Sequence, residues 1–213
     1  FNPHIGVEGG LSILGTSGIV EPMSMQAMID TMALELRQAA AQGHKRLILT
    51  PGNYGQDFLT RHGLDGLGVP VVKCANFIGD ALDQAAAEGF ESVLLVGHVG
   101  KLVKLAGGIM NTHSRYADCR TELFCAYAAV CGGGQALCEA LLDSATTDAC
   151  IALLDQAGLR APVMARLLAA IDGHVRRRVA GAYPVGVLLF SNVYGVLGRT
   201  EGYEEVLQEW KKV

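Results

Sequence analysis

Short apolar runs alternate with longer stretches of helical period along most of the chain. Five runs have the length and apolar content of buried strands: Leu11–Leu14, Arg46–Thr50, Val69–Cys74, Ser92–Val96 and Val185–Phe190. Strands that alternate with helices are typical of a largely parallel sheet with helices on its faces. The pattern therefore predicts a three-layer, Rossmann-like α/β fold.

The helical stretches carry start and stop signals. Ser24 is a suitable N-cap for a helix that stops at Gly43, and Asn76 is a suitable N-cap for the next one. Pro162 fits the first turn of a helix that ends near Gly181. These signals place helices between the predicted strands, as an α/β fold requires.

Residues 117–180 have helical period almost throughout. The breaks fall at Gly132–Gly134, at the cap signal Thr146-Thr147 and at Gly158, so we expect three or four helices inserted before the last strand. No linker rich in Pro, Ser or charge separates this segment from the rest. The whole chain, residues 1–213, is therefore expected to form one α/β domain with a helical insertion at about residues 117–180.

Composition and charge exclude several classes of function. Lys and Arg number 17 against 21 Asp and Glu, which gives a net charge of −4 and no field to attract nucleic acid. No apolar run approaches the about 18 residues of a membrane-spanning helix, and no signal for export is visible. The sequence indicates a cytosolic protein that binds neither nucleic acid nor membrane.

The loops that follow the predicted strands are rich in Gly and small polar residues. They are Gly15-Thr16-Ser17-Gly18, Pro51-Gly52-Asn53-Tyr54-Gly55, Asn76-Phe77, Gly97-His98-Val99-Gly100-Lys101 and Ser191-Asn192-Val193-Tyr194-Gly195. Ligands of open parallel sheets bind at the carboxyl ends of the strands, so five such loops together favour a ligand site. The first loop lacks the G-x-G-x-x-G of a dinucleotide site, but an adenosine without phosphates remains compatible.

A stretch without acidic residues adds a second clue. Between Ser92 and Ala117 there is no Asp or Glu, whereas Lys101, Lys104 and Arg115 occur there together with two histidines. Lys101 and Lys104 are three residues apart and would share one face of a helix. Such a basic surface beside a cleft favours a ligand with several carboxylates or phosphates.

Other kinds of chemistry find no support in the pattern. His98 and His113 lack a matching Cys or carboxylate pair at the spacing of metal ligands, so no metal site is predicted. No G-x-S-x-G elbow occurs, and no Ser, His and acid stand out as a triad. The residues alone predict an α/β domain that binds a small anionic ligand.

Longer strings carry a resemblance to a known family. They are Gly10-Leu11-Ser12-Ile13-Leu14-Gly15-Thr16-Ser17-Gly18-Ile19-Val20-Glu21-Pro22-Met23-Ser24, Pro51-Gly52-Asn53-Tyr54-Gly55, Lys73-Cys74-Ala75-Asn76-Phe77-Ile78-Gly79, Val96-Gly97-His98-Val99-Gly100-Lys101-Leu102-Val103-Lys104-Leu105-Ala106-Gly107-Gly108-Ile109-Met110-Asn111-Thr112-His113-Ser114-Arg115 and Phe190-Ser191-Asn192. In these strings the chain closely resembles the CbiD family of cobalt-precorrin-5B (C-1)-methyltransferases, which act in anaerobic cobalamin biosynthesis. Family members are longer, so we expect this chain to be their C-terminal part, without the N-terminal domain.

The resemblance implies transfer of a methyl group from S-adenosylmethionine to C-1 of cobalt-precorrin-5B, giving cobalt-precorrin-6A. The cobalt belongs to the substrate. Near the methyl donor we expect Gly15, Thr16, Ser17, Gly18, Gly52, Asn53, Asn76, Gly97 and His98. Near the acidic rim of the tetrapyrrole we expect Lys101, Lys104, Asn111, Thr112, His113, Ser114 and Arg115. His98 and His113 are the candidates for a catalytic general base.

Two other functions stay open. The chain could be a non-catalytic, tetrapyrrole-binding portion of such an enzyme, or a nicotinamide-dependent oxidoreductase of Rossmann type. The incomplete glycine fingerprint argues against the oxidoreductase. The sequence leaves open whether the protein is a homo-oligomer.

Overall fold

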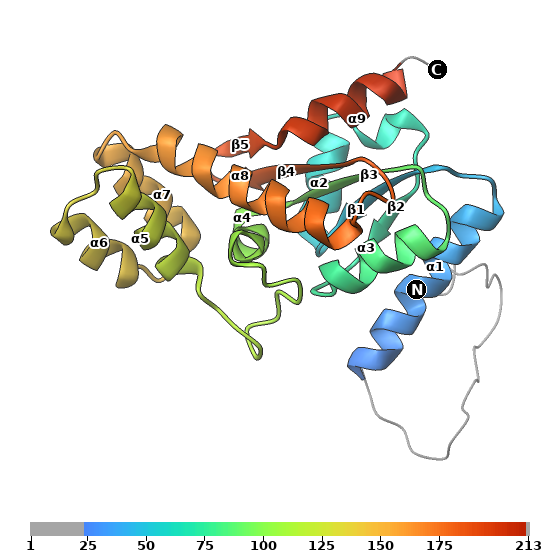
Figure 1. Cartoon of the computed structure of the whole chain (residues 1–213), viewed down its shortest axis with the longest axis horizontal. Coiled ribbons are helices and arrows are strands. Elements are labelled where there is room, and N and C mark those ends of the chain that lie inside the picture. Colours follow the sequence, from blue (N-terminus) through green and yellow to red (C-terminus); the bar gives the residue numbers. More distant parts are fainter. Residues whose placement is uncertain (1–23, 212–213) are drawn as a thin grey trace.

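A five-stranded sheet forms the centre of the protein in a computed structural model that describes residues 24–211 (Figure 1). The strands are β1 (Arg46–Thr50), β2 (Val71–Lys73), β3 (Ser92–His98), β4 (Val185–Ser191) and β5 (Gly195–Arg199). They lie in the order β2-β1-β3-β4-β5. The first four are parallel, and β5 runs antiparallel to β4. The prediction of an α/β fold with a mainly parallel sheet is confirmed.

Helices connect and cover the strands. They are α1 (Met25–Ala41), α2 (Asn53–Arg61), α3 (Ile78–Ala87), α4 (Val99–Leu102), α5 (Arg120–Val130), α6 (Gln135–Leu142), α7 (Thr147–Gln156), α8 (Arg160–Val179) and α9 (Glu201–Lys211). Two 3-10 helices, η2 (Asp65–Leu67) and η3 (Val103–Gly107), complete the described part. None of the helices within residues 24–211 is long and apolar enough to cross a membrane.

Side chains of the parallel strands alternate between two cores. Leu47 and Leu49 belong to the larger core, which also contains apolar residues of α1, α3 and α8. Ile48 lies between them in β1 and belongs to the smaller core, with residues of α2 and α9. Figure 1 shows α9 on one side of the sheet and α1 and α3 on the other. The sheet is thus buried on both faces, which explains why its central strands are continuous apolar runs.

Four of the five predicted strands are present. Three coincide closely with β1, β3 and β4, whereas the predicted run Val69–Cys74 is a strand only over Val71–Lys73. Leu11–Leu14 lies outside the described residues. The sequence did not predict β5, because its two glycines and short length are typical of a loop.

The helical signals were correct at three places and wrong at one. Ser24 caps α1, since its Oγ accepts a hydrogen bond of 3.1 Å from a first-turn N–H, and Gly43 follows the helix with φ +87°. Pro162 lies in the first turn of α8. Asn76 does not cap α3, because Phe77 occupies the cap position without a side-chain bond.

The helices expected at about residues 117–180 are α5, α6, α7 and α8. They are separated at the predicted glycines and at Thr146, whose Oγ1 accepts from the α7 N-terminus at 3.1 Å. The first three pack on one another at one end of the molecule, as Figure 1 shows, while α8 lies against the sheet.

Candidate functional site

The carboxyl ends of the parallel strands meet at one edge of the sheet. Thr50 at the end of β1 is in register with Lys73 of β2, and His98 of β3 is in register with Phe190 of β4. β2 lies on one side of β1 and β3 on the other, so the strand order reverses between β1 and β3. Ligands of open α/β sheets bind at such a reversal, which makes this edge the first candidate for a site.

A cavity of about 280 Å³ opens at this edge, on the side of β1 and β2. It is lined by Met28, Met32, Glu35, Gly52, Asn53, Gln56, Val71, Lys73, Cys74, Ala75 and Phe77. Apolar side chains come mainly from α1 and from the loop after β2, and polar ones from α1, β2 and the start of α2. Lys73 Nζ donates to Asn53 Oδ1 at 3.3 Å and so links two sides of the cavity. A wall of this mixed kind suits an organic ligand with apolar and polar parts.

The start of α2 brings backbone N–H groups to the cavity. Gly52 holds the cap position with φ +88°, which favours glycine, and no side chain caps the helix. One turn later a Cβ on Gly55 would lie 1.5 Å from Thr50 Oγ1, so only glycine allows α2 to lie so close to β1. The Pro51-Gly52-Asn53-Tyr54-Gly55 string therefore shapes the polar side of the cavity.

Lys101 lies in α4, directly after β3, and its ammonium is close to two residues of the cavity wall. Its half-buried ammonium donates to Ala75 O at 3.3 Å, and a Cβ on Gly52 would lie 3.6 Å from Nζ. Burial lowers the pKa of Lys101, whereas the neighbouring Cys74 has the opposite, smaller effect. Burial also raises the pKa of the Cys74 thiol to about 12, so this thiol is neutral at neutral pH.

His98 ends β3 and caps α4 with its side chain. Nδ1 accepts the backbone N–H of Gly100 at 3.0 Å. Partial burial lowers the pKa of His98, and the negative charge of Asp148 opposes this shift. A neutral ring whose Nδ1 accepts a hydrogen bond carries its proton on Nε2. In this geometry His98 is a neutral hydrogen-bond donor through Nε2.

A hydrogen-bonded pair joins the end of β4 to the helical insertion. Ser191 Oγ donates to Asp148 Oδ1 at 2.7 Å and accepts the backbone N–H groups of Val193 and Tyr194 at 3.0 and 3.2 Å. The hydroxyl therefore has three partners and is no free nucleophile. The pair fixes the first turn of α7 beside His98.

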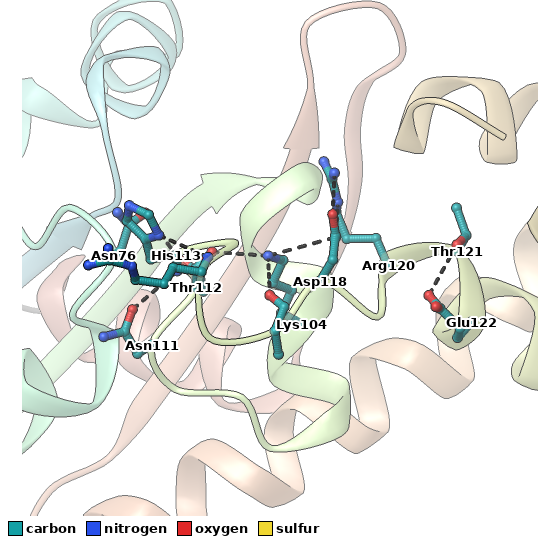
Figure 2. A network of polar contacts seen from close by, with 11 residues as sticks. Asn76, Lys104, Asn111, Thr112, His113, Asp118, Arg120, Thr121 and Glu122 are labelled. Atoms are coloured by element: carbon teal, nitrogen blue, oxygen red, sulfur yellow. Dashed lines mark hydrogen bonds and ion pairs between the residues drawn. The ribbon is translucent and has the colours of Figure 1, made fainter.

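Lys104 has a different place from Lys101. The ammonium is 3% exposed and donates to Thr112 O at 3.1 Å and Ala117 O at 2.8 Å, with Asp118 Oδ1 at 3.8 Å (Figure 2). The expectation that both lysines share one open helix face is wrong. α4 ends at Leu102 and continues as a 3-10 turn, so the side chain of Lys104 turns toward the 112–118 loop.

The segment after η3 forms a short bridge to the loop after β2. Thr112 N donates to Asn76 O at 2.9 Å, and Thr112 Oγ1 to Asn76 Oδ1 at 3.4 Å. This pairing, which connects residues 36 apart in the sequence, is why Asn76 is not a helix cap. Asn111 Oδ1 accepts the N–H of His113 at 3.1 Å, and His113 Nδ1 accepts that of Arg115 at 3.0 Å. Figure 2 shows Asn76, Asn111, Thr112 and His113 on one side of Lys104, which bonds to Thr112.

The structure thus gathers the predicted site residues into two groups. Gly52 and Asn53 line the cavity. A Cβ on Gly97 would lie 2.9 Å from a Pro51 side-chain atom, so the end of β3 lies beside the loop that begins at Pro51. Asn76, Asn111, Thr112, His113, Ser114 and Arg115 belong to the second group, in which the last three are exposed. Gly15, Thr16, Ser17 and Gly18 lie outside the described residues. Within residues 24–211 no three His, Cys, Asp or Glu side chains gather as metal ligands would.

Comparison with known proteins gives consistent matches. A protein of Ruminiclostridium cellulolyticum named cobalt-precorrin-5B C(1)-methyltransferase is 45% identical over 195 residues, 91% of this chain and 50% of the relative. A protein of the same name from Moorella thermoacetica is 36% identical over 212 residues, 98% of this chain and 57% of the relative. The family description "CbiD, C-terminal domain" matches residues 111–201, and "CbiD" matches residues 1–22.

The chain belongs to the CbiD family. The resemblance seen in the sequence is thereby confirmed. This CbiD chain spans about half the length of the curated relatives it matches first. No solved structure matches it.

Sequence reasoning missed two residues of this CbiD chain that lie near His98. Asp148 was overlooked because it is 50 residues from His98 in the sequence. Its place directly after the Thr146-Thr147 cap did indicate an acidic residue in the first turn of a helix. Ser191 was noticed in a strand-end loop and in the string Phe190-Ser191-Asn192, but without a role in the site. Its bond to Asp148 depends on the docking of α7 at the sheet, which no local pattern reveals.

Proposed function

We propose that this chain takes part in transferring a methyl group from S-adenosylmethionine to C-1 of cobalt-precorrin-5B, giving cobalt-precorrin-6A. The observation that carries the proposal is the 45% identity over 91% of the chain to a protein named for this reaction. The cavity at the strand ends supports it, because it offers an apolar wall together with backbone donors.

We also propose that the described fold is Rossmann-like. Its sheet order and helices on both faces are those of doubly wound sheets, which bind a nucleoside where the strand order reverses. The methyl donor would then lie against Gly52 and Asn53. Gly97 and His98 would lie on its other side, and Asn76 would contribute from the loop after β2. These residues fit an adenosyl group, since the open α2 terminus and the glycines allow close approach of the ligand.

When bound, S-adenosylmethionine supplies both the methyl group and the leaving group of an in-line displacement. The work left to the protein is to align the accepting carbon with the methyl group and to exclude water. His98 is suited to positioning, because its neutral ring presents a fixed N–H. His113 Nδ1 likewise accepts a backbone N–H, that of Arg115. Either histidine would act as a general base only after Nδ1 has left its backbone partner.

The acidic arms of the tetrapyrrole would meet the second group of residues. His113, Ser114 and Arg115 are exposed on the loop that Lys104 anchors. A guanidinium on such a loop suits a carboxylate, for which Arg provides a bidentate donor. The buried Lys104 would stabilise this loop through its hydrogen bonds to Thr112 O and Ala117 O. Asn111 and Thr112 would fix the loop backbone.

A calorimetric titration of the 213-residue chain with S-adenosylhomocysteine tests the proposal. Saturable one-to-one binding is expected. If this chain does not bind but a full-length relative does, the donor site needs the remaining half of the protein. If neither binds, or if the chain binds NADH instead, the methyltransferase assignment is wrong. Binding of the tetrapyrrole alone would favour a non-catalytic binding portion.

A further inference from the structure

The ammonium of Lys101 is a half-buried charge with one weak partner. Within residues 24–211 its one hydrogen bond goes to the carbonyl oxygen of Ala75 at 3.3 Å. Within residues 24–211 no carboxylate oxygen lies within 4.0 Å of Lys101 Nζ. A charge that leaves water without a counter-ion is costly, so such a group is suited to receive an anion.

The other two lysines near the strand ends are either paired with a carboxylate or exposed to water. Lys104 has two carbonyls and the carboxylate of Asp118, and the exposed Lys73 bonds to Asn53. Cys74 lies close enough to Lys101 to affect its pKa, but the thiol is neutral at neutral pH and provides no counter-charge. Lys101 therefore stands apart by its burial and by the absence of an anionic partner in the described part of the chain.

The position of Lys101 indicates which kind of anion it meets. Two residues of the wall of the 280 Å³ cavity lie close to its ammonium: Ala75, whose O accepts from Nζ at 3.3 Å, and Gly52, on which a Cβ would lie 3.6 Å from Nζ. A tetrapyrrole with its acetate and propionate arms is far larger than this cavity. An amino-acid carboxylate attached to a nucleoside is small enough to reach Lys101 while the nucleoside contacts the apolar wall.

We propose that Lys101 binds the carboxylate of the methionine moiety of the methyl donor, and not an acid group of the tetrapyrrole. This assignment rests on the proposed function and changes the place of Lys101 within it. Lys101 belongs to α4, which follows β3 directly, so its ammonium would fix the amino-acid part of the donor near His98. Lys101 is a binding residue and takes no part in bond making.

The test compares two ligands on two proteins by calorimetry. One ligand is S-adenosylhomocysteine; the other is its decarboxylated analogue S-adenosyl-3-thiopropylamine, which keeps the adenosine, the thioether and the amino group. Lys101→Met is expected to weaken binding of S-adenosylhomocysteine by roughly 10- to 100-fold, the range for hydrogen bonds to charged groups. The analogue is expected to bind the variant no more weakly than it binds the wild type.

Two further variants complete the design. Lys45→Met removes an exposed charge that pairs with Glu91 at 3.6 Å at the start of β1, and it is expected to change neither affinity. Lys101→Arg keeps the charge and should retain a preference for the carboxylate ligand. If Lys101→Met does not fold, Lys101→Gln is measured instead, with folding checked by urea unfolding.

The outcomes separate the inference from the proposed function. Equal losses for both ligands would mean that Lys101 shapes the cavity without contacting the carboxylate, and no loss for either would also overturn the inference. In both cases the methyl-donor site itself would stand. Failure of the wild-type chain and of a full-length relative to bind S-adenosylhomocysteine would overturn the site and the inference together.

Discussion

Replacing Lys104 with Met tests whether this lysine supports the loop or contacts a ligand. Met has a similar length but no donor, so Thr112 O and Ala117 O lose hydrogen bonds of 3.1 and 2.8 Å. A buried carbonyl without a partner costs about 1–3 kcal/mol. Thr112 is buried, whereas Ala117 is half-buried and partly open to water. We therefore expect the free energy of unfolding to fall by about 2–4 kcal/mol.

Urea unfolding followed by circular dichroism measures this change. For a chain of this size the loss corresponds to a decrease in Tm of about 4–16 °C. Lys45→Met is the matched control, because it removes an exposed charge that pairs with Glu91 at 3.6 Å, and we expect a change below about 0.5 kcal/mol. A loss below about 0.5 kcal/mol for Lys104→Met, with an unchanged m-value, would refute the assignment of Lys104 to the loop.

Three further predictions concern the strand ends. Gly55→Ala should prevent α2 from docking, because the new Cβ would lie 1.5 Å from Thr50 Oγ1; a Tm equal to that of the wild type would contradict this. Because burial lowers the pKa of His98, the unfolded chain binds more protons below about pH 6.5, so stability should fall as the pH drops from 6.5 toward the folded-state pKa. His98→Asn keeps an acceptor for Gly100 N and should lose this slope, which urea unfolding at several pH values would reveal. Ser191→Ala leaves two N–H groups and a carboxylate without their partner and should cost about 1–3 kcal/mol in the same assay, with no loss counting against the tether to α7.

The central strands and their helices could be predicted from sequence because each signal is local. An apolar run such as Ser92–Val96 is buried on both faces of a sheet, and its composition alone reveals this. Ser24 caps a helix through an atom three residues away. β5 has no such signal, since its exposed glycine-rich segment becomes a strand only by pairing with β4.

The candidate site was less predictable because its contacts join distant segments. Asn76 has the local features of a helix cap, but its partner is Thr112 in another loop. Lys101 and Lys104 look equivalent in a helical pattern, yet the chain changes from an α-helix to a 3-10 turn between them, so Lys101 bonds to Ala75 O and Lys104 bonds into the 112–118 loop. Spacing assigned these two lysines to one surface in error.

Helix α1 links the occupancy of the cavity to the dynamics of the chain. α1 supplies Met28, Met32 and Glu35 to the wall and packs mainly on α3 and β2. A ligand that touches this wall binds only while the helix is docked, so ligand at 100 times its Kd would stabilise the docked state by about 2.7 kcal/mol. Amide hydrogens of α1 should then exchange with solvent up to about 100-fold more slowly. The protection of the α1 amides from exchange would thereby report occupancy of the cavity.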